Sequence, residues 1–209
     1  MKKSLFKVCG MRDAANIKEL VALSPDFIGF IFYPKSSRFV STIDDRTLDL
    51  IPKKTRKVGV FVNEAMHKII GVATNFRLDA VQLHGYETPD MCRKLKDEGY
   101  MVIKAFHIAS ADDFSETSEY EGACDYYLFD TKTQGYGGSG VTFDWAFLDR
   151  YTGQTPFLLS GGIRPDSVQD LWKLTHPMLA GFDINSGFEL KPAFKDISLI
   201  KRFKERMIL

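Results

Sequence analysis

Residues 80–106 read AVQLHGYETPDMCRKLKDEGYMVIKAF, and this stretch decides the fold. Two short apolar runs lie at its ends, Ala80–His84 and Val102–Phe106. Between them, Thr88 is a typical N-cap residue, Pro89 suits the first helical position, and Gly99 suits the residue after a helix end. The stretch therefore predicts a strand, a helix, and a second strand parallel to the first.

Similar apolar runs, rich in β-branched and aromatic residues, recur along the whole chain. They lie at Phe6–Val8, Phe27–Phe32, Lys57–Val62, Ala80–His84, Val102–Phe106, Tyr126–Phe129, Pro156–Leu159 and Gly181–Ile184. Most are continuously apolar, as strands buried on both faces are. Helical patterns separate them at Asp13–Leu23, Glu64–Asn75, Thr88–Glu98, Pro165–Leu174 and Asp196–Met207. The segments after the second and sixth runs are less helical.

Eight strand–helix units predict an α/β protein with a parallel sheet. Eight units favour closure into a single (β/α)8 TIM barrel, although 209 residues is short for that fold. An open doubly wound sheet is the alternative. No linker or change of composition marks a second domain, so we expect one domain over residues 1–209.

Composition excludes several classes of protein. With 28 basic and 27 acidic residues the net charge is +1, which gives no electrostatic reason to expect nucleic acid or an anionic membrane as partner. The amino-terminal charges are not followed by the apolar core of a signal peptide, so a cytoplasmic protein is expected. Three widely spaced cysteines suit reduced thiols rather than disulfides or structural zinc. A monomer is expected, because no long apolar stripe is evident.

Polar residues gather at the ends of the expected strands, where this fold places its active site. Cys9 ends the first strand and Asp130 the sixth. Because side chains alternate along a strand, Lys7 shares a face with Cys9, and Gln82 shares one with His84.

A buried Lys7 needs a carboxylate partner, since an unpaired buried charge is costly. Asp183 on the eighth strand is the predicted partner, and Lys104 is expected to join the same network.

Each of these residues also has an ordinary structural interpretation. Cys9 alone is more often a small buried apolar residue than a base. Asp130 suits a helix cap, His84 a packing role, and Arg38 an ordinary surface position. Their convergence on one rim favours function.

Two glycine-rich turns predict a phosphate site. Ser160-Gly161-Gly162-Ile163 follows the seventh strand, and Asn185-Ser186-Gly187 follows the eighth. Phosphate binds between these loops in many such barrels, because glycine lets backbone N–H groups approach its oxygens. The alternative is a pair of ordinary left-handed turns.

A third glycine cluster, Gly135–Gly140, matches the dinucleotide pattern G-x-G-x-x-G in letters only. It neither joins a strand directly to a helix nor precedes an acidic residue at the required distance. We therefore interpret residues 131–143 as a lid over the site.

The ordered motifs resemble those of the phosphoribosylanthranilate isomerase family of tryptophan biosynthesis. The segments that carry the resemblance are KVCGMR at 7–12, FIFYPKSSR at 30–38, VGVFVN at 58–63, VQLHG at 81–85, FDT at 129–131, GGSG at 137–140 with FDW at 143–145, LSGGI at 159–163, and DINSGFE at 183–189 with Lys195-Asp196. They run in family order over nearly the whole chain.

The resemblance implies an Amadori rearrangement of N-(5′-phosphoribosyl)anthranilate to 1-(2-carboxyphenylamino)-1-deoxy-D-ribulose 5-phosphate. It implies neither metal nor cofactor. Asp130 matches the general acid of the family and Cys9 the general base, while Arg38 matches the residue that binds the anthranilate carboxylate. The other matching positions are Gly161, Gly162, Ser186 and Gly187 for phosphate, and Gln82, His84 and Asp183 on the rim.

Two departures from the family pattern are small: Asn185 stands where serine is more usual, and Ser160 where alanine is. Alternatives of the same fold are a histidine-pathway isomerase, which would use two aspartates, and indoleglycerol-phosphate synthase, which would need a lysine and glutamates. A barrel that only binds a phosphorylated metabolite would need neither Cys9 nor Asp130.

The proposed acid and base place opposite demands on their surroundings. A free cysteine is mostly thiol at neutral pH, so Lys7 or Arg38 is expected to favour the Cys9 thiolate. Apolar surroundings are expected to keep Asp130 partly protonated.

Overall fold

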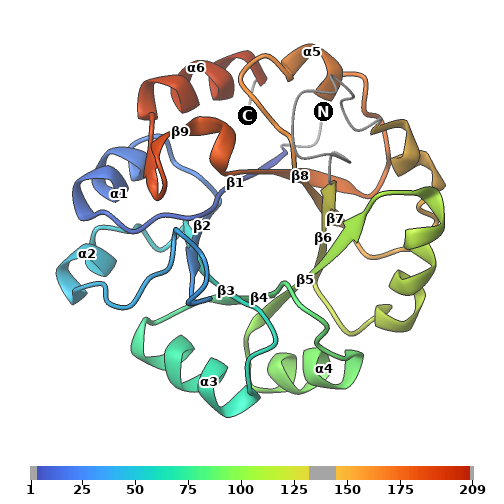
Figure 1. Ribbon diagram of the computed structural model, residues 1–209, viewed down its shortest axis with the longest axis horizontal. Coiled ribbons are helices and arrows are strands. Elements are labelled where there is room, and N and C mark those ends of the chain that lie inside the picture. Colours follow the sequence, from blue (N-terminus) through green and yellow to red (C-terminus); the bar gives the residue numbers. More distant parts are fainter. Residues whose placement is uncertain (1–3, 132–144, 208–209) are drawn as a thin grey trace.

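The computed structural model of the protein describes residues 4–131 and 145–207. Eight parallel strands form a closed barrel in chain order (Figure 1). They are β1 (Leu5–Val8), β2 (Phe27–Ile31), β3 (Arg56–Phe61), β4 (Ala80–Leu83), β5 (Met101–Ile108), β6 (Tyr126–Thr131), β7 (Phe157–Ser160) and β8 (Leu179–Ile184). Because β8 pairs with β1, the predicted barrel is confirmed and the open sheet is excluded.

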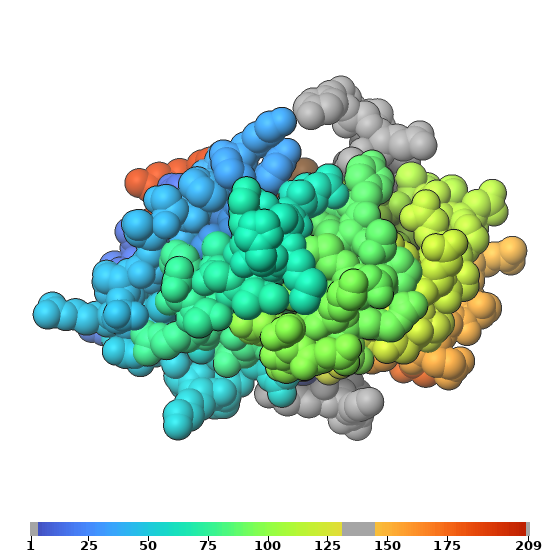
Figure 2. Space-filling model, turned by 90° about the horizontal axis from the view of Figure 1, so that it is seen from below, coloured from blue at the N-terminus to red at the C-terminus, as the bar shows by residue number. Residues whose placement is uncertain are grey.

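Helices surround the ring of strands (Figure 1). They are α1 (Ala14–Val21), α2 (Asp45–Asp49), α3 (Met66–Asn75), α4 (Pro89–Asp97), α5 (Val168–Leu171) and α6 (Ile197–Met207), with 3-10 helices η1 (Ala111–Tyr120), η2 (Trp145–Arg150) and η3 (Ser186–Phe188). Figure 2 shows the side of the molecule formed mainly by the first half of the chain. No helix within the described ranges is long and apolar enough to cross a membrane.

The predicted helix caps are present. The Asp13 side chain accepts from the N–H of Asn16 at 2.9 Å, and Thr88 Oγ1 accepts from the N–H of Met91 at 3.3 Å. Gly99, after α4, has a φ of +90°, which favours glycine.

One connection is less helical than the pattern predicts. The expected helix at 165–174 is reduced to α5, because Pro165 stands in a turn closed by the N–H of Ser167 on the carbonyl of Arg164. The connection after β5 contains the 3-10 helix η1, and the described part of the connection after β6 contains η2, in line with the weak helical pattern there. Residues 132–144, which hold most of the expected lid, lie outside the described ranges.

The barrel interior is apolar toward the amino-terminal ends of the strands and polar toward their carboxyl ends. The apolar layers contain Phe27, Val58, Ala80, Ile103, Ala105 and Leu128. Above them lie the buried polar side chains of Lys7, Gln82 and Asp183. This arrangement follows from side-chain alternation along the strands.

Lys7 and Asp183 form an ion pair at the seam where the barrel closes. They are register partners on β1 and β8, and Lys7 Nζ lies 2.7 Å from Asp183 Oδ2. Their side chains are 0% and 4% exposed, so the predicted pairing is confirmed within the core.

The prediction that Lys104 joins this network is wrong. Its neighbours Ile103 and Ala105 face the barrel interior, so Lys104 points to the outer face of β5. There Lys104 Nζ donates to the carbonyl of Gly85 at 2.6 Å and lies 3.5 Å from Glu87 Oε2.

Replacing Lys7 should destabilise the barrel. In Lys7→Met the Asp183 carboxylate stays buried without its cation, and we expect a loss of about 3–5 kcal/mol in unfolding free energy. Urea denaturation followed by circular dichroism measures it. The control is Lys173→Met, which breaks the exposed pair with Asp170 and should cost less than about 1 kcal/mol. Equal losses in the two variants would contradict a structural role for the buried pair.

Candidate active site

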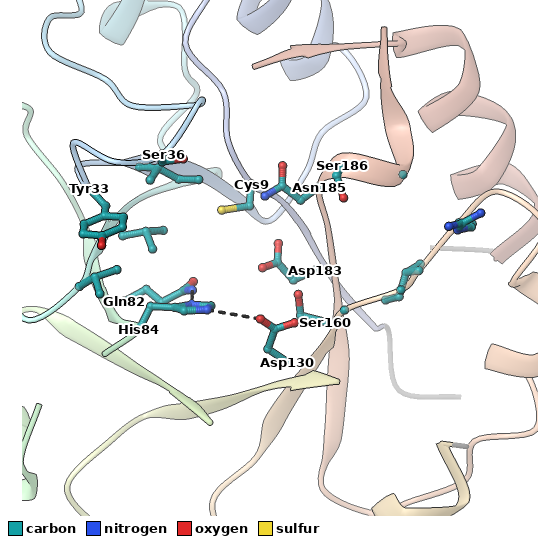
Figure 3. A pocket seen from close by; sticks show the side chains of 18 of the residues that line it. Cys9, Tyr33, Ser36, Gln82, His84, Asp130, Ser160, Asp183, Asn185 and Ser186 are labelled. Carbon is teal, nitrogen blue, oxygen red and sulfur yellow. Dashed lines mark hydrogen bonds and ion pairs between the residues drawn. The ribbon is translucent and has the colours of Figure 1, made fainter. Parts of the chain in front are cut away.

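A pocket of about 990 Å³ opens at the carboxyl ends of the strands. Side chains from β1 to β4 and from β6 to β8 converge on it because each of these strands turns its last inward residue toward the mouth (Figure 3). The predicted site residues that line it are Cys9, Gln82, His84, Asp130, Gly161, Gly162, Asp183, Ser186 and Gly187. Arg38 is absent from the described lining.

Cys9 is buried just beyond β1 and packs onto β2 at Gly29. A Cβ at Gly29 would lie 2.7 Å from Cys9 Sγ, so the missing side chain makes room for the thiol. Burial raises the pKa of the Cys9 thiol, and the charge of Lys7 opposes the rise. Lys7 is therefore the expected cation that favours the thiolate, but desolvation of Cys9 has the larger effect on its pKa.

The ion pair of Lys7 and Asp183 lies beneath Cys9, at the floor of the pocket. Burial disfavours the charged form of Lys7, but Asp183 and Cys9 outweigh it and raise the Lys7 pKa. Burial also raises the pKa of Asp183, and the contact with Lys7 opposes this rise. Asp183 lies between Cys9 and Asp130 in Figure 3.

Asp130 lies against two imidazoles rather than in the apolar surroundings that we expected. Its Oδ2 is 3.4 Å from His84 Nε2 and 3.6 Å from His107 Nδ1. His84 is held in turn by Gln82, whose Nε2 lies 2.9 Å from His84 Nδ1. The ligand atoms of His84, His107 and Asp130 lie within 4.8 Å of one another, close enough to hold a metal ion.

Two buried acceptor atoms of the pocket lack a hydrogen-bond donor within the described residues: Gln82 Oε1 and Asp183 Oδ1. Buried polar atoms without partners are costly and rare in proteins. Because both side chains line the pocket, hydroxyl groups of a ligand can satisfy them.

The glycine turns after β7 and β8 lie together at one side of the pocket. Gly161 and Gly162 have φ angles of +82° and +66°, the left-handed region that glycine favours. A Cβ at Gly187 would lie 2.5 Å from the carbonyl oxygen of Ile163, so the two loops touch here. Arg164, in the next position, also lines this side and adds a cation.

Arg38 is held beside the pocket by the short antiparallel hairpin of β9 (Glu189–Lys191) and β10 (Phe194–Lys195). Its Nε and Nη2 donate to the two Glu189 oxygens at 2.9 and 2.6 Å. Lys195 Nζ, which is buried, donates to Glu189 Oε1 at 2.7 Å and to Asn185 Oδ1 at 2.6 Å.

The contacts among Arg38, Glu189 and Lys195 stabilise the charged forms of Glu189 and Arg38. Burial works to raise the pKa of Glu189, but Arg38 and Lys195 outweigh it and hold that pKa below its ordinary value. The hydrogen bond to Glu189 raises the pKa of Arg38.

Some residues of this end of the barrel were missed by sequence reasoning: His107, Arg164, Glu189 and Lys195. His107 had a usable signal, because it continues the inward alternation of Ile103 and Ala105. Glu189 and Lys195 stand among the segments that carry the family resemblance, but no residue pattern predicted their contact with Arg38, since only the hairpin brings the three residues together.

Comparison with known proteins agrees with this geometry. Residues 6–206 match the family described as N-(5′-phosphoribosyl)anthranilate (PRA) isomerase. The N-(5′-phosphoribosyl)anthranilate isomerase of Parabacteroides distasonis is 48% identical over 206 residues, 98% of this chain and 93% of that protein.

Two solved structures match over nearly the full length. The phosphoribosyl anthranilate isomerase of Thermotoga maritima is 37% identical, with a TM-score of 0.85 and 99% of each chain covered. Another structure, of a phosphoribosyl anthranilate isomerase in complex with reduced 1-(o-carboxyphenylamino)-1-deoxyribulose 5-phosphate, is 33% identical, with a TM-score of 0.79 and 99% of each chain covered. The chain therefore belongs to the phosphoribosylanthranilate isomerase family of tryptophan biosynthesis.

Proposed function

We propose that this isomerase converts N-(5′-phosphoribosyl)anthranilate to 1-(2-carboxyphenylamino)-1-deoxy-D-ribulose 5-phosphate, with Asp130 as general acid and Cys9 as general base. The observation that carries this proposal is the position of the two groups: both line one pocket, Cys9 beyond β1 and Asp130 on β6, across the barrel mouth. General acid and base catalysis requires both groups within reach of a single bound substrate.

The proposed reaction moves protons without any change in overall composition. Protonated Asp130 gives its proton to the ribose ring oxygen, the bond from C1′ to that oxygen breaks, and the nitrogen lone pair forms an iminium. The Cys9 thiolate then removes the proton from C2′, which leaves an enolamine. The proton on Cys9 is then returned to C1′ while the 2′-hydroxyl loses its proton, which gives the ketone, and that hydroxyl proton restores the acid form of Asp130.

The pocket lining supports recognition of the whole substrate. The backbone of Gly161, Gly162 and Gly187, with Ser186, is proposed to bind the phosphate. Arg164 adds positive charge at the same loops. Gln82 Oε1 and Asp183 Oδ1, which have no donor among residues 4–131 and 145–207, are suited to accept from sugar hydroxyls.

Arg38 is proposed to bind the anthranilate carboxylate, although its fork faces Glu189 in this structure. A carboxylate entering here meets a site in which Arg38 and Lys195 share one counter-ion. When Arg38 turns toward the substrate, Lys195 still neutralises Glu189, so Glu189 does not repel the incoming carboxylate.

Removal of either proposed catalytic group should lower turnover and spare binding. Cys9→Ser and Asp130→Asn should each reduce kcat by about 10²–10⁴-fold, because each removes one proton transfer. Steady-state kinetics measure kcat, and calorimetry with ribose 5-phosphate measures binding, which should change little. Cys92→Ser, a buried thiol on α4, is the control and should retain turnover. Near-normal kcat in Cys9→Ser would refute the base assignment.

The ionisation of Cys9 should respond oppositely to its two charged neighbours. In wild type, burial should place half-maximal alkylation by iodoacetamide above about pH 8.5, the value of an ordinary thiol. Lys7→Met removes a cation that lowers the Cys9 pKa, so its midpoint should move to higher pH. Asp183→Asn removes a charge that raises it, so its midpoint should move to lower pH. Peptide mass spectrometry at Cys9 gives the rates, and shifts of both variants in one direction would contradict this electrostatic account.

The proposed activity as a whole is tested by complementation. A tryptophan auxotroph that lacks this isomerase should grow without tryptophan when it expresses the chain, and should fail to grow with Asp130→Asn. No growth despite well-expressed, folded wild-type protein would overturn the proposed function.

A further inference from the structure

A second chemical property of the site follows from His107, which the proposed reaction does not use. Two imidazoles, those of His84 and His107, face one carboxylate, that of Asp130. The two rings lie 5.2 Å apart between centroids and meet at 67°. Each residue offers one ligand atom, and the three atoms lie within 4.8 Å of one another.

The three residues stand on adjacent strands of the barrel. His107 and Asp130 are register partners on β5 and β6, so their side chains leave the sheet side by side. His84 directly follows β4, where its N–H donates to the carbonyl of Phe61. The side chains of His84 and Asp130 are 25% and 24% exposed, and that of His107 is 43% exposed, so an ion can enter from the mouth.

The ligand set selects a class of ion. Two imidazole nitrogens and one carboxylate oxygen suit Zn²⁺ and similar first-row ions, whereas Mg²⁺ and Ca²⁺ prefer oxygen ligands alone. Three protein ligands leave a fourth tetrahedral position for water. Asp130 Oδ2 lies 3.4 Å from His84 Nε2 and 3.6 Å from His107 Nδ1, close to the spacing of ligand atoms around one tetrahedral ion, so small side-chain rotations suffice to form the site.

Gln82 can prepare His84 for this role. Its Nε2 now faces His84 Nδ1, and Gln82 Oε1 is buried without a donor in the described part of the chain. If the Gln82 amide turns over, Gln82 Oε1 accepts a hydrogen bond from the Nδ1–H of His84. The lone pair of His84 Nε2 then faces Asp130 and the ion. A ligating histidine commonly donates its second N–H to a carbonyl oxygen in this way.

We propose that His84 Nε2, His107 Nδ1 and an Asp130 carboxylate oxygen bind Zn²⁺ at the mouth of the barrel, and that the ion inhibits the isomerase. The ion takes the carboxylate that the proposed reaction needs as its acid. The metal site itself does not depend on that reaction, and only the inhibition rests on the proposed function.

Zinc binding to the folded, metal-free protein tests the site without any enzyme assay. Competition with a chromophoric chelator should show one Zn²⁺ bound per chain. Co²⁺ bound at the same site should show the visible d–d absorption of an ion with few ligands. His107→Gln should weaken Zn²⁺ binding at least about tenfold, because one ligand is lost. His67→Gln removes an exposed histidine of α3 and should bind as the wild type does, and Mg²⁺ should not compete.

A second arm measures inhibition. Zn²⁺ should inhibit isomerase turnover reversibly on addition of EDTA, and His107→Gln should raise the inhibitory concentration by the same factor as it weakens binding. Absence of Zn²⁺ binding in wild type, or equal affinity in wild type and His107→Gln, overturns the site. Binding that is lost in Cys9→Ser and kept in His107→Gln also overturns it, because the thiol would then be the ligand. Confirmed binding by a chain without isomerase activity would refute the proposed function and leave the metal site standing.

Discussion

The ion pair between Lys7 and Asp183 is the interaction on which both the barrel and its site depend. A (β/α)8 barrel closes only when its first and last strands meet in register, and this pair stands at that seam. A charge pair in a nearly water-free interior tolerates little displacement, because each partner would otherwise be buried alone. The same pair lies beneath Cys9, so the contact that helps to align the seam also sets the electrostatic potential at the thiol.

Because of that double role, opposing effects act on the ionisation of Cys9. Burial favours the neutral thiol, Lys7 favours the thiolate, and Asp183 opposes Lys7. Asp183 is itself paired with Lys7, and its other oxygen, Oδ1, is buried without a hydrogen-bond donor among the described residues. A substrate hydroxyl that donated to this oxygen would weaken its effect on Cys9, so substrate binding would be coupled to activation of the proposed base through one carboxylate.

Much of this arrangement could be predicted from the sequence because it depends on local periodicity. Continuous apolar runs located the eight strands, and alternation put Lys7 and Cys9 on one face. The need of a buried lysine for a counter-ion led to Asp183. The same alternation explains why Lys104 lies outside this network, because its apolar neighbours Ile103 and Ala105 face the interior and place Lys104 on the outer face.

The remaining features depend on contacts between distant segments. The two-residue strand β10 has no periodic signal, yet it brings Lys195 to Glu189 and both to Arg38. The two imidazoles beside Asp130 come from separate strands, and only the barrel register brings them together.

Gly29 has a consequence for redesign of this barrel. Because a side chain at position 29 would meet the Cys9 sulfur at 2.7 Å, the glycine sets the space available to whatever group ends β1. Attempts to exchange the thiol for a carboxylate must keep position 29 empty, and a library that varies both positions will return viable members mainly where glycine is retained. Position 29, which carries no functional group, thus limits which chemistries the scaffold can be made to perform.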